Sequence, residues 1–111
     1  MLFRSENIEA SIAEVEAAGL PYFIVGHVGD GNFHMAYLLD PARPEELATA
    51  ERLSAQMVAR AIALEGTCTG EHGIGLHKMG FLVTEAGEGA VDMMRTLKRA
   101  LDPRKIGRAH V

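Results

Sequence analysis

The pattern of apolar and polar residues predicts a helix near the start of the chain. Apolar side chains recur at helical spacing over residues 7–18, and Gly19 follows as a stop signal. Ser5 or Asn7 is available as the cap at its start. The apolar positions of the segment are Ile8, Ile12, Val15 and Ala18. The spacing therefore predicts an amphipathic helix.

Three later stretches have the same spacing. Residues 45–64 form the longest, which is rich in alanine and which Gly66 ends. Its expected buried stripe consists of Leu47, Ala50, Leu53, Met57, Val58, Ala61 and Ile62. Residues 81–85 and 89–101 also have helical spacing, and Asp102-Pro103 closes the last helix. That helix carries one apolar face, which is made of Val91, Met94, Leu97 and Leu101.

Between the first two helices, two runs rich in β-branched and aromatic residues predict a hairpin. Its strands are residues 22–27 and 33–39. Asp30-Gly31 between them favours a two-residue type I′ turn, which needs positive φ at both positions. This turn would place His27 directly opposite His34. Apolar residues occupy both faces of the hairpin, so we expect it to be a covered part of a larger sheet.

A third strand is expected at the start of residues 66–80, a stretch too rich in glycine to be regular throughout. The order helix, strand, strand, helix, strand, helix then predicts an α+β fold in which an antiparallel sheet has helices packed on one face. A chain of 111 residues is long enough for one small domain with a modest core.

Composition and charge narrow the class of protein. The net charge of −4 gives no basic patch for nucleic acid or anionic lipid. The single cysteine, Cys68, rules out an internal disulfide and fits a reducing compartment. No apolar run approaches the roughly 20 residues of a membrane span. We therefore expect a soluble protein without a nucleic-acid partner.

Both ends of the chain look foreign to the fold. Residues 1–5 and 106–111 match what the two strands of a common sequencing adaptor would encode. We therefore expect the genuine protein sequence to run from about Glu6 to Lys105 and to be an internal fragment of a longer protein.

Candidate chemistry is concentrated in two glycine-rich stretches. His27 and His34 flank the predicted turn, and Glu71 and His72 are neighbours in a loop that glycines allow to turn sharply. Two histidines and one carboxylate bind a metal with one coordination position left open, as in catalytic sites. Zn²⁺ fits such a set, and Mn or Fe are alternatives. The remaining histidine would be available as a base.

Neighbouring residues have simpler interpretations. Cys68 is expected to be a small buried hydrophobe, with metal ligation or redox sensitivity as a minor alternative. Asp30 is expected to form the turn rather than to bind metal. Asn32 belongs either to the turn or to a substrate contact. His77 and Lys78 are expected to be solvated.

The residues of these stretches closely resemble the C-terminal domain of FAD-linked oxidases and dehydrogenases of the vanillyl-alcohol oxidase superfamily. The stretches are GHVGDGNFH at residues 26–34, GTCTGEHGIG at residues 66–75 and a closing LDP at residues 101–103. The resemblance covers residues 6–105 and is nearest to the D-lactate dehydrogenase (cytochrome) and glycolate oxidase catalytic-subunit branches. It implies the ferredoxin-like part of that domain as the fold.

The resemblance also implies a site. A divalent metal, Zn or Mn, would be bound by His27, His34 and Glu71. His72 would be the catalytic base, and Asn32 is the candidate for substrate contact. The implied reaction is metal-assisted oxidation of the α-hydroxyl of a small D-2-hydroxy acid, with hydride transfer to FAD.

Further expectations follow from the same resemblance. FAD would be bound mainly by an N-terminal domain that this chain lacks, so the fragment alone would be inactive. The electron acceptor would be a quinone, a cytochrome or a flavoprotein, and the location cytoplasmic, with peripheral contact to the inner membrane.

The predicted hairpin also bears on the substrate, and other functions remain open. Val25 and Ala36 share the face of the two histidines and offer nothing polar to a second carboxylate, so a small monocarboxylate such as lactate or glycolate is preferred. Two other classes are compatible with the same residues: a metal-dependent hydrolase, and a non-catalytic module whose metal stabilises a loop.

Overall fold

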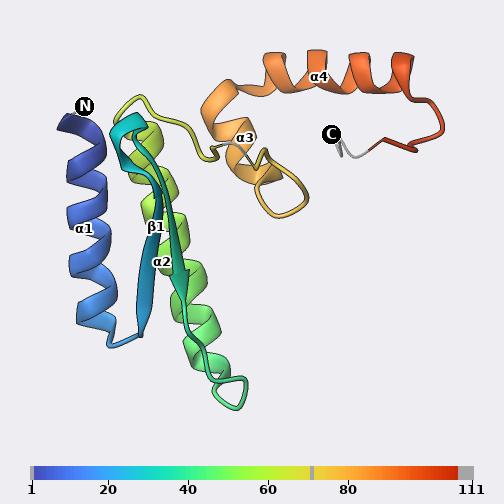
Figure 1. The fold of residues 1–111 in the computed structure, drawn as a ribbon. Coiled ribbons are helices and arrows are strands. Elements are labelled where there is room, and N and C mark those ends of the chain that lie inside the picture. The colour runs from blue at the N-terminus through green and yellow to red at the C-terminus, as the bar shows by residue number, and fades with distance from the viewer. Residues whose placement is uncertain (1, 71, 108–111) are drawn as a thin grey trace. The chain divides into compact units, whose positions relative to one another are not determined.

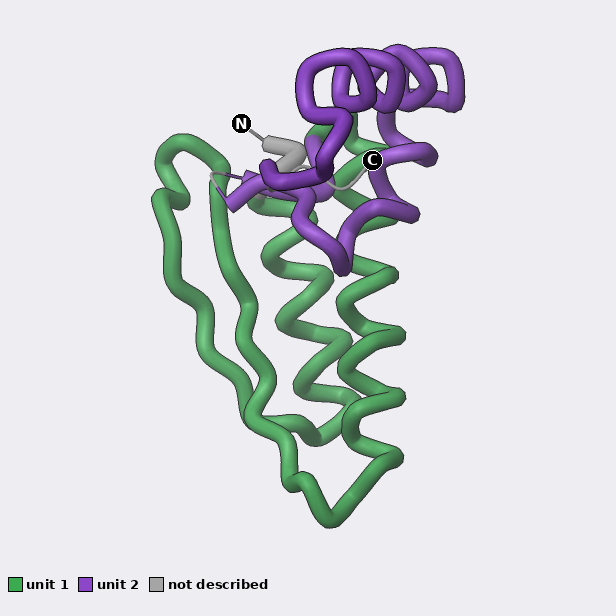
Figure 2. The backbone as a smooth tube through the Cα atoms, turned by 90° about the vertical axis from the view of Figure 1, so that its right-hand side faces the viewer, with its two compact units in different colours: residues 1–66 green, residues 67–111 purple. Residues whose placement is uncertain are grey.

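The computed structural model describes residues 2–70 and 72–107. Its elements in chain order are α1 (Leu2–Ala18), β1 (Tyr22–His27), the 3-10 turn η1 (Val28–Asp30), β2 (Asn32–Tyr37), α2 (Pro44–Ala63), α3 (Met79–Ala86) and α4 (Glu88–Leu101) (Figure 1). The chain divides into two compact units, unit 1 (Met1–Gly66) and unit 2 (Thr67–Val111) (Figure 2). This mixture of helices with an antiparallel pair of strands confirms the α+β class.

The sheet of unit 1 is a two-stranded antiparallel hairpin with helices on one face. Figure 2 shows both helices of unit 1 on the same side of the hairpin. The core between the two layers consists of Val15, Leu20, Ala50 and Leu53, with Tyr22, Met35, Tyr37 and Leu39 packed against it. The prediction of an antiparallel sheet with helices on one face is therefore confirmed.

The other face of the hairpin is open. Phe23 and Val25 alternate with the core-facing residues of β1 and are 49% and 54% exposed. Among the described residues, no further strand pairs with β1 or β2. The prediction of a covered hairpin in a larger sheet is therefore wrong for the described part of the chain.

The expected third strand is also absent from the described residues. The main-chain N–H of Cys68, which a neighbouring strand would have bound, donates to Glu85 Oε2 at 3.0 Å. A side chain from α3 thus takes the place of a strand partner at the start of the glycine-rich loop.

The turn between β1 and β2 is longer than a type I′ turn. Val28, Gly29 and Asp30 form the single 3-10 turn η1, and Gly31 follows with φ of +72°. The N–H of Gly31 donates to the Val28 carbonyl at 2.9 Å. Because Asp30 lies inside η1, only Gly31 has the positive φ that the type I′ prediction requires at both positions.

Polar side chains join α1 to α2. Asn7 and Ser11 are each 3% exposed, and both accept hydrogen bonds from Arg60 of α2, at 3.1 and 3.2 Å. Arg60 also pairs with Glu14, and Asn7 Nδ2 donates to the Met57 carbonyl at 3.2 Å. Asn7 therefore lies inside α1 and is not its cap, because the helix begins upstream, at Leu2.

The long helix α2 buries three of the seven residues of the predicted stripe. Ala50, Leu53 and Val58 are buried, whereas Leu47 is 53% exposed and was wrongly placed in the core. The helix ends in a Schellman motif, in which the N–H groups of Glu65 and Gly66 donate to the carbonyls of Ile62 and Ala61 at 3.0 and 2.7 Å. Neither α2 nor any other described helix is long and apolar enough to cross a membrane.

Unit 2 consists of the glycine-rich loop, α3 and α4. Val91 is the buried residue of α4, and the other residues of its predicted apolar face, Met94, Leu97 and Leu101, are exposed. After α4, the Asp102 carboxylate accepts the N–H groups of Ile106 and Gly107 at 2.9 and 2.7 Å and pairs with Lys98. These bonds fold the chain back on the end of the helix.

Candidate functional site

The outer face of the hairpin brings together three of the predicted site residues. His27 pairs with Asn32 across the strands, and His34 pairs with Val25. Since alternate residues of a strand point to the same side, His27, Asn32 and His34 share one face with Val25. Residues on this face point away from the core that contains Tyr22, Met35 and Tyr37.

His27 and His34 are diagonal neighbours and not the directly opposed pair that was predicted. The longer turn shifts the register by two residues, so Asn32 takes the place opposite His27. Because side chains alternate with a period of two, this shift leaves every residue on its predicted face. Diagonal neighbours on one face lie about 7–8 Å apart, a distance that aromatic and other long side chains can span.

Gly26 positions His27 through a close contact between the strands. Its φ is +148°, which side-chain-bearing residues rarely adopt. A Cβ at this position would lie 2.6 Å from the carbonyl oxygen of Asn32 and 2.8 Å from the Cα of Phe33. Glycine is therefore required here for the two strands to meet next to His27.

His72 lies exposed in a tight turn of the loop in unit 2. The N–H of Gly73 donates to the Gly70 carbonyl at 3.3 Å, and the Thr69 hydroxyl donates to the Gly73 carbonyl at 2.7 Å. Gly73 and Gly75 have φ of +74° and +58°, as expected for a loop that needs glycine to turn sharply. These bonds link Thr69 and Gly70 to Gly73, which follows His72.

Glu71, the predicted carboxylate ligand, lies outside the described residues. Among residues 2–70 and 72–107, no group of three or more His, Cys, Asp or Glu side chains is placed to hold a metal ion. The structure brings the two histidines of unit 1 onto one face. That Glu71 and His72 of unit 2 complete the site with them stays a prediction.

Cys68 is a buried, unreactive thiol at the start of the same loop. It is 5% exposed, and burial together with its hydrogen bond to the Glu85 carboxylate raises the pKa of Cys68 to about 11. Because a metal ligand or nucleophile must be a thiolate, this environment argues against both roles. The interpretation of Cys68 as a small buried hydrophobe is confirmed.

Glu85 is a structural residue that the sequence pattern did not reveal. Its carboxylate accepts the main-chain N–H of Cys68, and this bond lowers the pKa of Glu85, helped by side-chain hydrogen bonds from Cys68 and Thr67. The apolar spacing marks Glu85 only as part of a helix. Its role depends on a contact across seventeen residues, which no local signal shows.

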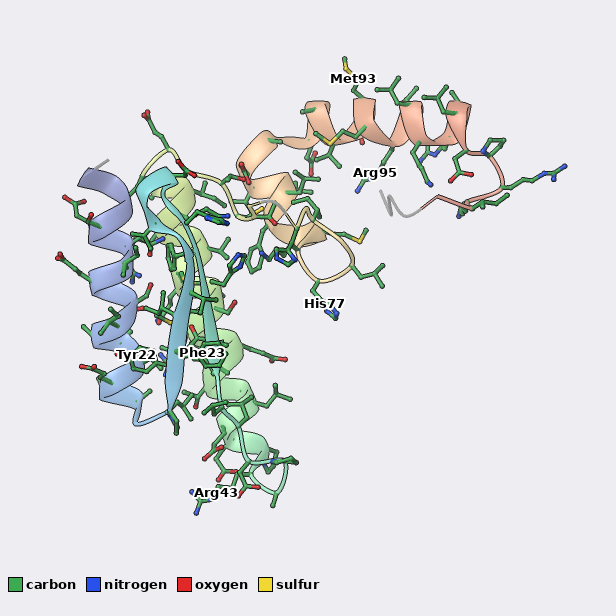
Figure 3. The ribbon with its side chains drawn as sticks, in the orientation of Figure 1. Tyr22, Phe23, Arg43, His77, Met93 and Arg95 are labelled. Carbon is green, nitrogen blue, oxygen red and sulfur yellow. The ribbon has the colours of Figure 1, made fainter. Side chains whose placement is uncertain are left out.

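The remaining candidates lie at the edges of these loops. His77 is exposed, as expected, and is labelled in Figure 3 on the loop before α3. Lys78 is half-buried where α3 begins, so it is less solvated than expected. Asp30 is part of η1, which agrees with its interpretation as a turn residue.

Comparison with known proteins gives the same family over nearly the whole chain. The family described as FAD linked oxidases, C-terminal domain, matches residues 5–106. A mitochondrial D-lactate dehydrogenase (cytochrome) of Kluyveromyces lactis is 50% identical over 102 residues, which is 92% of this chain and 17% of that protein. The Arabidopsis thaliana protein of the same name is 43% identical over 102 residues, or 92% of this chain and 18% of that protein.

A bacterial relative has a different substrate in its name. The glycolate oxidase subunit GlcD of Bacillus subtilis is 41% identical over 81 residues, which is 73% of this chain and 17% of that protein. The chain thus spans less than a fifth of the length of each of these relatives. Since the family match extends over residues 5–106, the chain belongs to the FAD-linked oxidases, as their C-terminal domain.

Proposed function

We propose that this chain is the substrate- and metal-binding part of a flavin-dependent D-2-hydroxy acid dehydrogenase of the D-lactate or glycolate type. The observation that carries the proposal is that His27, Asn32 and His34 share one face of the hairpin. Family membership and the names of the relatives support the flavin-dependent oxidation.

The proposed site holds a divalent cation. Two imidazoles at diagonal positions supply two nitrogen ligands on one side, and Glu71 supplies the third ligand in the proposal. A bound Zn²⁺ or Mn²⁺ would supply positive charge that makes the α-hydroxyl of the substrate more acidic. In the proposal Asn32, which lies opposite His27, contacts the substrate through its side-chain amide.

The proposed chemistry removes one proton and one hydride from the substrate. His72 takes the hydroxyl proton, a role that suits histidine because an imidazole nitrogen is a common general base. FAD, which would be held by another part of the holoenzyme, would supply the acceptor for the hydride of the α-carbon. We assign no residue of this chain to the flavin, and the isolated chain is expected to have no turnover.

The proposal also covers the electron acceptor and the location of the protein in the cell. The electron acceptor would be a quinone, a cytochrome or a flavoprotein. Cytoplasmic location with peripheral contact to the inner membrane stays a prediction, and the relatives from Kluyveromyces lactis and Arabidopsis thaliana are named mitochondrial.

A chimeric holoenzyme tests the function. Residues 5–106 would replace the matching segment of the Kluyveromyces lactis protein, and D-lactate-dependent reduction of an artificial acceptor would be measured together with flavin and metal content. We expect the chimera to be active. His72→Ala should lower kcat by about 10²–10⁴-fold with flavin content unchanged, as for loss of a general base.

Metal content tests the ligands separately from turnover. His27→Ala and His34→Ala should each lose the bound metal, whereas His77→Ala, an exposed histidine outside the set, should keep both metal and activity. Normal turnover in the His72→Ala chimera would refute the assignment of the base. A folded, flavin-loaded chimera that oxidises no 2-hydroxy acid would overturn the proposed function.

A further inference from the structure

The face that carries the two histidines changes from polar to apolar along its length. Its cross-strand pairs are His27 with Asn32 next to the turn, then Val25 with His34, then Phe23 with Ala36 at the far end. Val25 is thus the first apolar side chain beyond the proposed metal ligands on β1, and it is 54% exposed.

We propose that Val25 is a specificity-determining residue, which contacts the substituent on the α-carbon of the bound hydroxy acid and selects a short apolar group over one that carries a second carboxylate. This inference rests on the proposed function and adds to it the side chain that discriminates between substrates.

The register supports this placement. Directly opposed residues have Cβ atoms about 4.5–5.5 Å apart, so the Val25 side chain lies beside the His34 imidazole. It also lies two residues before His27 on the same face of β1. A small acid held at the two histidines therefore has Val25 within van der Waals reach on the side away from the turn.

The chemistry of the face explains the expected selectivity. A methyl group against Val25 loses contact with water at no cost in hydrogen bonds. A carboxylate in the same place would be partly desolvated beside Val25, Phe23 and Ala36, whose side chains have no donor to offer it. Substrates with a second carboxylate are therefore disfavoured by the residues of this face.

The chimeric holoenzyme described above provides the test. The measured quantity is the ratio of kcat/KM for D-lactate to kcat/KM for D-malate, which differs from D-lactate by one carboxylate. Val25→Lys places a cation beside the substituent and is expected to lower this ratio at least 30-fold. Equilibrium binding of the products pyruvate and oxaloacetate, measured by calorimetry on the oxidised chimera, should shift in the same direction without any turnover.

Val28→Lys is the matched control. Val28 is also 54% exposed and lies in the same hairpin, but it belongs to η1 and not to the histidine face. The Val28→Lys variant should leave the kcat/KM ratio of the two substrates and the binding ratio of the two products within about threefold of the parent values. One added surface charge has only a weak effect at a distance in water.

A second variant covers the case in which Val25→Lys does not fold or loses its flavin. Val25→Ala only truncates an exposed side chain, and the extra room should raise kcat/KM for D-2-hydroxyisocaproate relative to D-lactate at least fivefold. The inference is overturned if the folded, metal-loaded Val25 variants keep the substrate and product ratios of the parent. Failure of the parent chimera to oxidise either acid would instead count against the proposed function.

Discussion

At the scale of single residues, the end of α2 contains a strained position. Glu65 has φ of +60° and occupies the position of the Schellman motif at which glycine is usual, while the glycine, Gly66, comes one residue later. The sequence signal for a helix stop is therefore correct in kind, but it places the glycine one residue away from the left-handed position. A left-handed backbone costs an L-residue roughly 1–2 kcal/mol.

Glu65→Gly is expected to stabilise the chain. Relief of the strain outweighs the larger conformational entropy that glycine brings to the unfolded chain, with a net gain of about 0.5–1 kcal/mol in the free energy of unfolding. Urea denaturation of the full chain measures it. Glu51→Gly, at an exposed position inside α2, is the control and should cost about 1 kcal/mol. A loss of stability in Glu65→Gly would show that the strain is not relieved.

Asp102 makes the end of α4 sensitive to acid. Its ion pair with Lys98, together with the N–H groups of Ile106 and Gly107, lowers the pKa of Asp102 from 3.8 to about 2. A lowered pKa in the folded state contributes stability that is fully present above pH 3.8 and is lost as the pH falls through about 2.

The Asp102→Ala variant tests this pH dependence. The difference in free energy of unfolding between the wild type and the variant should be constant above about pH 5 and should shrink steadily towards pH 2. Denaturant titrations at several pH values measure it. Asp92→Ala, which removes a more exposed carboxylate from the same helix, is the matched control. A difference that does not change between pH 5 and pH 2 would contradict the assignment.

At the scale of elements, the pairing of α1 with α2 depends on Arg60. Its guanidinium group donates to Asn7 and Ser11 and pairs with Glu14, whose Oε2 has no hydrogen-bond partner among the described residues. Removing the cation would leave these polar groups, two of them on residues 3% exposed, without their main donor.

Arg60→Met is expected to destabilise the chain by about 2 kcal/mol, because loss of one partner leaves the others buried and unsatisfied. The free energy of unfolding from urea titration measures the change. Arg52→Met, an exposed arginine on the same helix, should change it by less than about 0.5 kcal/mol. Adding Glu14→Gln to Arg60→Met should recover part of the loss. If Arg60→Met is as stable as the wild type, the polar cluster is not a source of stability.

The elements themselves are largely predictable from the sequence. The strand at residues 22–27 and the helices near residues 45–64 and 89–101 agree with the structure to within a residue or two. Local spacing determines these elements. The turn is less predictable, because Asp-Gly is compatible with both a two-residue turn and η1, and only the paired strands choose between them.

At the scale of the whole molecule, the two units differ in how much core they contain. The buried apolar residues described in unit 1 include Val15, Leu20, Leu53 and Val58, whereas those of unit 2 are Cys68 and Val91. Packing contacts in a core join residues far apart in the sequence.

The contact between the main chain of Cys68 and the side chain of Glu85 in α3 is of the same kind. The local spacing of apolar residues therefore could not predict that the start of the glycine-rich loop binds a side chain of α3 instead of a strand.

The candidate site was predictable from the sequence only in part. The faces of His27, Asn32 and His34 follow from strand alternation, which survives the change of register. The pairing of the two imidazoles across the strands depends on the turn, and the Asp-Gly pattern predicted the wrong register. That Glu71 and His72 join these residues stays a prediction, because they lie in the other unit of the chain.

The open hairpin of unit 1 has a practical consequence for work with the isolated chain. The outer edges of its two strands pair with no other described strand, and the apolar side chains of Phe23 and Val25 beside them are exposed. Such edges template intermolecular β-pairing and aggregation. Solubility at high concentration is therefore the first quantity to control during purification.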